Sequence, residues 1–310
     1  MDKGAKTFAM SKITDFAEKF EKNLNTNVSL SNYSWFNLGG VAEFLFKPKD
    51  KKQLLDFLFE SKNKNLKITI IGAGSNTLFR DNGIKGAVIK LGSNFSYTKL
   101  LDKNTIEVGA ATLDRQVASF ARDNNLTNFE FLSCIPGSIG GAVIMNSGCY
   151  DNDISQILHS IKVIDINNLE EKEINKEEIN FYYRGTSLSN NLIILSAKLK
   201  GLISSKIKIE KKQADFKERK KISQPSQIKT CGSTFKNISK DKKAWTYIKK
   251  AGCDNLSEGD AIISKKHCNF FVNNGKAKSS DIEKLIKKVK KIVRNKTGVD
   301  LELEIKIVGE

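Results

Sequence analysis

The chain has 310 residues, of which 39% are hydrophobic and 8% aromatic, and it carries a formal net charge of +17. This length suits two or three domains with a substantial buried core. Lysines spread along the chain supply the charge, which indicates either a solvated lysine-rich surface or attraction to anionic ligands. A phosphate-bearing small ligand fits better than nucleic acid, because neither a basic helix with base-reading residues nor an RNA-binding signature is present.

Cysteine usage and hydropathy exclude further classes. The five cysteines are odd in number and no two have C-x-x-C spacing, so we expect neither a disulfide framework nor a zinc site. No apolar run approaches the roughly 20 residues of a membrane span, and the N-terminus lacks the apolar core of a signal peptide. We therefore expect a cytoplasmic protein with reduced thiols, no metal and no membrane insertion.

Hydrophobic periodicity predicts an α+β chain in which helices and strands alternate. Amphipathic or surface helices are expected over residues 12–23, 51–63, 113–124, 203–226 and 281–295. Strands are expected over residues 41–48, 67–71, 86–91, 105–111, 158–166, 192–199 and 300–309. The composition shifts to long charged segments after Leu199, and this shift indicates a smaller α/β domain in the last third.

The stretch from Phe129 to Tyr150 holds four glycines, one of only three prolines and no charge after Glu130. Glycine lets another molecule approach the main chain closely, and successive free N–H groups form nests that bind phosphates. The stretch is therefore either a phosphate-binding loop or a buried, turn-rich connection between strands.

A second glycine-rich loop, GAGSNTLFRDNG at residues 72–83, follows a predicted buried strand. It begins like a dinucleotide fingerprint, but Thr77 stands where the third glycine belongs and no acidic residue ends a following strand. A Rossmann site is therefore not favoured. Main-chain N–H groups with Ser75 and Asn76 can still hold a pyrophosphate, and the alternative is a plain strand-to-strand turn.

The remaining chemistry favours a cofactor enzyme. The two histidines, His159 and His267, lie near no nucleophile motif, which disfavours a Ser–His–Asp hydrolase, and no ligand cluster suggests metal catalysis. Two glycine-rich loops suit a large dinucleotide, with a separate domain supplying polar groups at its reactive end. Arg184 follows two tyrosines, an arrangement that suits either packing or an anion clamp.

Six motifs in this order resemble the MurB family of UDP-N-acetylenolpyruvoylglucosamine reductases. They are GAGSNTLFRDNG at 72–83, CIPGSIGGAVIMNSG at 134–148, YR at 183–184, GSTFKN at 232–237, HCNFFVN at 267–273 and LELEIKIVG at 301–309. The short segment between Arg184 and the GSTFKN motif lacks room for the extra tyrosine-bearing loop of the family's first type, so the chain resembles the second type. Ile238 and Leu303 replace prolines common in the family, and neither change removes a functional group.

The resemblance implies a two-lobed FAD-binding domain of the vanillyl-alcohol-oxidase/PCMH type, followed by a smaller α/β substrate-binding domain. The expected divisions are a helix and lead-in over 1–25, the FAD domain over 26–203 with lobes divided near residue 92, and the substrate domain over 204–310. The implied reaction takes hydride from NADPH through non-covalent FAD to the enolpyruvyl ether of UDP-N-acetylglucosamine, giving UDP-N-acetylmuramate for peptidoglycan. We expect a monomer.

The resemblance also implies site residues. Hydride addition builds negative charge, which Arg184 stabilises with help from Glu304, while Ser233 gives its proton to the adjacent carbon. The alternatives are a solvent-facing strand position for Glu304, on the same face as Glu302, and a turn hydroxyl for Ser233. Implied FAD contacts are Gly72, Ala73, Gly74, Ser75, Asn76, Thr77, Pro136, Gly137, Ser138, Gly140, Gly141, Asn146 and Gly148. Implied substrate contacts are Tyr183, Lys236, Asn237, Tyr247, Asn269 and Asn273.

Two other functions stay open from the sequence. One is an oxidase or dehydrogenase with the same flavin fold and another substrate. The other is a nucleic-acid-binding protein that uses the basic surface. A flavin spectrum excludes the second, and NADPH oxidation that depends on the enolpyruvyl sugar nucleotide excludes the first.

Overall fold

The computed structural model describes residue 16 and residues 18–310 of the chain. The helix predicted over residues 12–23 lies partly outside this part. Within it, Phe16 and Phe20 are buried and their rings pack on Phe57, with centroids 5.2 Å apart in both cases. Phe57 in turn stacks on Phe46 at 3.8 Å. An aromatic cluster therefore begins the core of the first lobe.

The first lobe is built on a four-stranded sheet. Its strands, in spatial order, are β1 (Leu24–Ser29), β2 (Val41–Phe46), β5 (Ile84–Lys90) and β3 (Ile68–Ile71). β1 and β2 are antiparallel and joined through the 3-10 turn η1 (Leu30–Tyr33), whereas β2 and β3 run parallel to β5. The connection from β2 to β3 is α2 (Lys51–Asn63), as parallel strands require a crossover.

The second lobe holds a five-stranded antiparallel sheet. In spatial order its strands are β12 (Glu171–Asn175), β11 (Leu158–Asp165), β15 (Leu192–Lys200), β7 (Thr105–Gly109) and β6 (Thr98–Leu100). Its helices are α3 (Asp114–Asp123) and α4 (Ile139–Ile144), with 3-10 turns η2 (Ser93–Phe95), η3 (Glu130–Cys134), η4 (Ile154–Gln156) and η5 (Lys176–Glu178). Short ladders pair β8 (Leu126–Thr127) with β16 (Leu202–Ile203), β9 (Gly148–Cys149) with β10 (Asn152–Asp153), and β13 (Phe181–Tyr182) with β14 (Gly185–Thr186).

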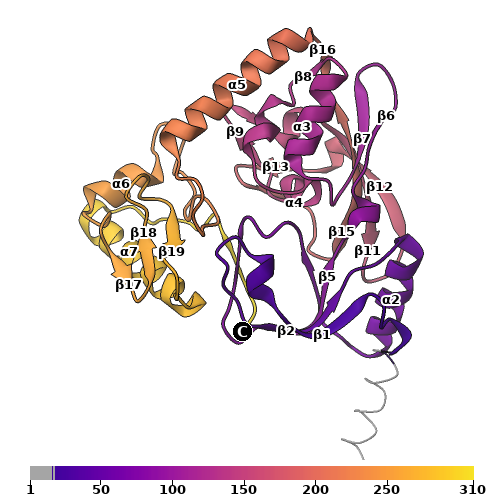
Figure 1. Ribbon diagram of the computed structural model, residues 1–310, viewed down its shortest axis with the longest axis horizontal. Coiled ribbons are helices and arrows are strands. Elements are labelled where there is room, and N and C mark those ends of the chain that lie inside the picture. Colours follow the sequence, from indigo (N-terminus) through magenta and orange to yellow (C-terminus); the bar gives the residue numbers. More distant parts are fainter. Residues whose placement is uncertain (1–15, 17) are drawn as a thin grey trace, which may run out of the picture.

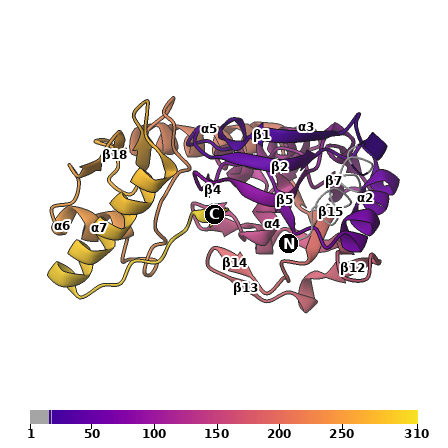
Figure 2. The same cartoon turned by 90° about the horizontal axis from the view of Figure 1, so that it is seen from below.

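The long helix α5 (Lys206–Ser223) leads from the second lobe to a C-terminal body (Figure 1). It packs on the lobe, because Phe216 is buried in the lobe's core and Gln213 donates from Nε2 to the Ala118 carbonyl at 3.0 Å. The C-terminal body has a three-stranded antiparallel sheet and two helices (Figure 2). These elements are β17 (Ser257–Glu258), β18 (Ala261–Ile263), β19 (Phe271–Asn273), α6 (Ala244–Lys250) and α7 (Ser279–Thr297).

The chain returns to the first lobe at its end. The final strand β20 (Lys306–Val308) runs parallel to β4 (Thr77–Phe79), which lies inside the predicted phosphate loop. The loop is thus partly a strand, and the glycine-rich stretch likewise contains the short helix α4 where turns were expected. No helix among the described residues is long and apolar enough to cross a membrane.

Candidate active site

The two predicted glycine-rich loops lie side by side. Ser75 donates from Oγ to the Pro136 carbonyl at 2.6 Å, which ties the first loop to the second. A Cβ added to Gly72 would lie 3.2 Å from Ser138 Oγ. Gly74 has φ +72° and a Cβ there would meet the Tyr33 carbonyl at 1.8 Å, so only glycine fits. Segments about 60 positions apart in sequence thereby form one surface.

The glycines of the second loop differ in what surrounds them. A Cβ on Gly137 would lie 2.6 Å from Asp114 Oδ2, one on Gly140 would lie 3.2 Å from Ala110 Cβ, and one on Gly148 would lie 2.3 Å from the Asn152 carbonyl. A Cβ on Gly141 would meet no atom of the described residues within 4 Å. Gly141 therefore presents open main chain, as a closely approaching ligand requires, and the loops fit a bound FAD.

The other residues of the two loops hold the local structure. Asn146, at φ +40°, donates from Nδ2 to the Tyr182 carbonyl at 3.2 Å and accepts from the Ser155 N–H at 3.0 Å. Ser138 is buried at the start of α4, and Ala73 lies in the bend between β3 and β4. Thr77 begins β4, where it pairs with Lys306.

Arg184 lies in the turn of the β13–β14 hairpin with φ +59°. Its Nε donates to Glu304 Oε1 at 2.8 Å and its Nη2 donates to the Gly148 carbonyl at 2.8 Å. The guanidinium also lies 4.8 Å from the ring centroid of Tyr183. Burial tends to lower the pKa of Arg184, but Glu304 and Tyr183 raise it and the net shift is upward. A fixed cation therefore stands beside the glycine-rich loops.

Glu304 is inside the site, whereas Glu302 is at the surface. The Glu304 side chain is 17% exposed, against 77% for Glu302, so the alternative of a shared solvent face for the two residues is wrong. Burial raises the pKa of the Glu304 carboxyl, and Arg184 opposes this shift without cancelling it. Asn76 of the first glycine loop donates from Nδ2 to the Glu304 carbonyl oxygen at 3.0 Å. The loop therefore positions this carboxyl.

The extended segment that holds Ser233 and Lys236 pairs with the segment that holds Glu304. The Glu304 N–H donates to the Thr234 carbonyl at 2.9 Å, and the Lys236 N–H donates to the Glu302 carbonyl at 2.8 Å. Ser233, half-buried, forms a bridge with Phe270 on the other side. Lys236 is close enough to Glu304 to lower its pKa. The three predicted catalytic residues thus come from linked segments.

The predicted substrate residues divide into two groups. Tyr183, Asn237 and Tyr247 are partly or largely exposed, and Asn237 donates from Nδ2 to Tyr183 Oη at 3.2 Å. Asn269 and Asn273 are buried and bonded to main chain. Asn269 accepts from the Phe235 N–H through Oδ1 and donates to the Phe235 carbonyl from Nδ2. Asn273 donates to the Phe36 carbonyl. Both amides thus already have protein partners. Their contact with the sugar stays a prediction.

One buried carboxyl was missed from the sequence. Asp114 has no hydrogen-bond partner for either carboxyl oxygen among the described residues, and burial raises its pKa well above the usual range. Its N–H donates to the Gly137 carbonyl at 3.2 Å, directly behind the second loop. An acidic residue at a helix N-terminus looks like an ordinary favourable charge, so no sequence signal marked its burial.

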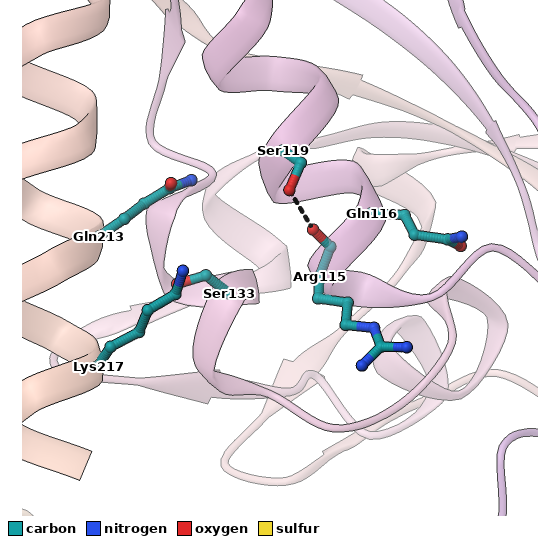
Figure 3. Close-up of a pocket in the computed structure, with 6 residues that line it drawn as sticks. All are labelled: Arg115, Gln116, Ser119, Ser133, Gln213 and Lys217. Atoms are coloured by element: carbon teal, nitrogen blue, oxygen red, sulfur yellow. Dashed lines mark hydrogen bonds between the residues drawn. The ribbon is translucent and has the colours of Figure 1, made fainter. Parts of the chain in front are cut away.

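The open pocket drawn in Figure 3 is a different place. Its volume is about 430 Å³ and it lies between α3, η3 and α5. Its lining is Arg115, Gln116, Ser119, Ser133, Gln213 and Lys217. None of the predicted FAD, catalytic or substrate residues contributes to it. The candidate site is therefore defined by the convergence of Arg184, Glu304 and Ser233 with the glycine-rich loops.

Comparisons with known proteins agree with this geometry. A family model described as UDP-N-acetylenolpyruvoylglucosamine reductase, C-terminal domain, matches residues 224–308, and one described as FAD binding domain matches residues 42–168. The chain is 43% identical over 302 residues to the UDP-N-acetylenolpyruvoylglucosamine reductase of Pelagibacter ubique (strain HTCC1062), covering 97% of this chain and 99% of that protein. The chain belongs to the UDP-N-acetylenolpyruvoylglucosamine reductase (MurB) family.

Further relatives support the family across the whole length. The chain is 42% identical over 283 residues to the reductase of Wolbachia sp. subsp. Drosophila simulans (strain wRi), covering 91% of this chain and 95% of that protein. The crystal structure of MurB from Thermus caldophilus aligns with TM-score 0.79 and 30% identity, covering 90% of this chain and 97% of that one. The expected α+β fold, a two-lobed FAD-binding domain followed by a smaller domain, is confirmed.

Proposed function

We propose that this MurB-family chain reduces the enolpyruvyl ether of UDP-N-acetylglucosamine enolpyruvate to UDP-N-acetylmuramate, with NADPH as hydride donor and FAD as cofactor, in peptidoglycan precursor synthesis. Family membership over nearly the whole chain supports the reaction. The observation in the structure that carries it is the half-buried Arg184–Glu304 pair, joined by a hydrogen bond of 2.8 Å and linked through Gly148 and Asn76 to both glycine-rich loops.

FAD, when bound, supplies the chemistry of hydride transfer from NADPH to the enolpyruvyl group. The chain would hold it through main-chain groups of the two glycine-rich loops, with Gly141 as the open point and Ser75 keeping the loops together. The remaining predicted contacts, from Gly72 to Thr77 and from Pro136 to Gly148, would complete this cradle.

Arg184 and Glu304 would stabilise the negative charge that develops beside the substrate carboxylate. Arg184 is fixed in advance by two hydrogen bonds and by Tyr183, and pre-oriented charge of this kind is the most effective electrostatic stabiliser. Glu304 in its protonated form would donate a hydrogen bond, and burial favours that form by raising its pKa.

Ser233 would deliver the proton to the substrate carbon. A serine hydroxyl is a weak acid, so it must be oriented and the alkoxide that it leaves must be supported. Lys236, which follows three residues later and acts electrostatically on Glu304, is the cation that we propose for this support. Gly232, directly before the serine, has φ +78°, and a Cβ added to it would meet no atom of the described residues within 4 Å.

The UDP-sugar would be held by the exposed polar groups between the second lobe and the C-terminal body. Tyr183, Lys236, Asn237 and Tyr247 would contact its phosphates or carboxylate. Asn269 would act mainly by holding the Phe235 main chain, and thus Ser233, in place. Asn273 would do the same for the segment at Phe36. We place the enzyme in the cytoplasm as a monomer.

The decisive experiment uses purified protein. It should be yellow with a flavin spectrum. It should oxidise more NADPH than the single equivalent that reduces its flavin only when the enolpyruvyl sugar nucleotide is present. A flavoprotein that oxidises NADPH equally well without this substrate would instead be another reductase or oxidase of the same fold. A colourless folded protein without flavin affinity would contradict the proposal as a whole.

A further inference from the structure

β6, β16 and the first turn of α5 lie near one end of the second lobe, away from the C-terminal body (Figure 1), and five aliphatic side chains in these segments are exposed. They belong to β6 and the residue after it, to β16 and to the first turn of α5. We call them the apolar patch: Leu100, Leu101, Leu202, Ile203 and Ile207. Their exposure ranges from 41% for Leu101 to 78% for Ile207. Single exposed apolar residues are ordinary, but such a group marks an interaction surface.

Main-chain hydrogen bonds join the turn after β6 to the residue before β16, and α5 follows β16 after two residues. The Leu101 N–H donates to the Thr105 carbonyl at 2.9 Å, and the Gly201 N–H donates to the Asn104 carbonyl at 2.9 Å. β16 is paired with β8, so its two apolar residues are carried on a ladder. The apolar patch is therefore a built surface, and its side chains are presented without any rearrangement of the chain.

Lysines surround the apolar patch. We call them the lysine rim: Lys99, Lys103, Lys200, Lys206 and Lys208, all exposed. Two acidic residues lie beside this rim and reduce its charge without cancelling it. Asp123 pairs with Lys206 at 3.1 Å. Asp102 accepts from the N–H groups of Asn104 and Thr105 and lies close enough to Lys200 for that lysine to act on its pKa. The rim therefore offers positive charge around an apolar centre.

We propose that the apolar patch and the lysine rim dock the protein reversibly on an anionic lipid surface. Aliphatic side chains would enter the boundary between headgroups and acyl chains while the lysines contact lipid phosphates. A second copy of the chain fits this surface less well, because it would bring two positive rims together. None of the predicted site residues belongs to the patch, so docking and the reductase reaction are independent.

The test is co-sedimentation of the flavin-loaded protein with vesicles. We expect binding to vesicles of phosphatidylglycerol and phosphatidylcholine in equal parts, weaker binding at high salt, and little binding to phosphatidylcholine alone. No binding to the anionic vesicles at low salt would overturn the proposal.

Matched variants separate the patch from the general charge. Ile207→Gln should weaken vesicle binding about tenfold, from the lost apolar burial. Ile222→Gln, on the same helix at 70% exposure but outside the patch, should have little effect. Lys99→Gln with Lys208→Gln should weaken binding about fivefold for each lysine. Lys287→Gln with Lys291→Gln on α7 makes the same change in net charge and should matter much less.

Two results would overturn the proposal although the vesicles bind. Equal loss of binding in both lysine pairs would mean that net charge alone is responsible. A dimer in sedimentation velocity that Ile207→Gln converts to monomer would mean that the patch is a contact between copies. Flavin content and reductase activity should be parental in all these variants, which confirms that they fold.

Discussion

The Glu304 carboxyl is subject to opposing influences at the scale of a single residue. Burial raises its pKa above the ordinary value of 4.5, while Arg184 and Lys236 act to lower it. Because the folded-state pKa is the higher one, this group's contribution to stability is full below 4.5 and is lost as pH rises through the raised pKa. The same protonated form is the one proposed to donate a hydrogen bond in the reaction.

A pH profile tests the protonated Glu304. The rate at which substrate reoxidises the reduced flavin should fall as pH rises through the raised pKa, because the donor is then lost. Glu304→Gln keeps a neutral donor at every pH and should lack this decline, although its rate is lower. Single-turnover kinetics at the flavin absorbance measure both. An unchanged decline in Glu304→Gln would assign the titration to another group.

Arg184→Ala separates the two half-reactions. Reoxidation of flavin by substrate should slow by a factor that corresponds to several kcal/mol, because developing charge loses its fixed partner. Reduction of flavin by NADPH should change far less. Arg184→Lys is the matched control for charge, since it keeps the cation without the two-pronged geometry. Equal loss in both half-reactions would indicate a folding or FAD defect.

Ser233→Ala tests the proton donor. Ser233 acts only after hydride has reached the substrate, so FAD binding and reduction by NADPH should be almost intact. Reoxidation by the enolpyruvyl substrate should slow roughly 10²–10⁴-fold, the usual range for general acid catalysis. Ser233→Cys should retain part of the activity, because a thiol can still give a proton. A parental reoxidation rate in Ser233→Ala would leave Glu304 or a water as the acid.

At the scale of elements, the residue pattern within a segment predicts a helix or strand that depends on neighbouring residues alone. The predicted helix over 51–63 coincides with α2, because Leu54, Phe57 and Leu58 recur at helical spacing and Asp50 caps the first turn. The sequence predicts a loop or turn at 72–83, whereas the structure has β4 within it. Its partner β20 lies at the other end of the chain, with Asn76 and Glu304 228 positions apart. Pairing at such separation leaves no periodic signal.

The site shows the same limit. Both glycine-rich loops were found from composition, but Arg184, Ser233 and Glu304 were chosen through the family resemblance. Their convergence depends on the β20–β4 pairing and on the bridge between Phe235 and Leu303. The roles of these residues and the domain divisions near 25, 92 and 203 stay predictions.

Substitution of Gly141, which lies on α4, tests whether the glycine-rich loops bind FAD. Gly141→Ala adds a Cβ that meets no atom of the described residues, and alanine in place of glycine in a helix should stabilise the apoprotein by about 0.5–1 kcal/mol. FAD affinity should nevertheless fall, because the methyl group occupies the space of a close ligand. Gly92→Ala, whose added Cβ has only an ordinary contact at 3.9 Å, is the control. A variant with a full flavin complement would show that the loop assignment is wrong.

At the scale of the whole molecule, Asp81 of the first loop is one of the links between the first lobe and the C-terminal body. Asp81 accepts from the N–H groups of Ser279 and Ser280 at 2.8 and 2.9 Å, so it caps α7 from outside that helix. Arg80 beside it pairs with Glu283 at 2.9 Å. The loop that we propose to hold FAD therefore also caps the N-terminus of α7, the longer helix of the C-terminal body.

Asp81→Ala should weaken the link between the first lobe and the C-terminal body. Two N–H groups at the start of α7 lose their acceptor, and the loss of a capping side chain typically costs about 1 kcal/mol in free energy of unfolding. Burial acts to raise the pKa of Asp81, but the hydrogen bonds from Ser280 and Ser279 outweigh it and the net shift is downward from 3.8. The stabilisation is therefore present above 3.8 and is lost as pH falls through the lowered value. Chemical denaturation of parent and variant should show a difference at neutral pH that shrinks in acid.

The matched control is Asp241→Ala, which removes an exposed carboxylate from the C-terminal body and should leave stability nearly unchanged. Because the cap links the two bodies, Asp81→Ala should also reduce the rise in melting temperature that added FAD produces in the C-terminal body. Fluorescence of Trp245 on α6 reports this change when parent and variant both carry Trp35→Phe, which removes the other tryptophan. A variant as stable as the parent, with the same response to FAD, would mean that the pairing of β20 with β4 joins the two parts without help from Asp81.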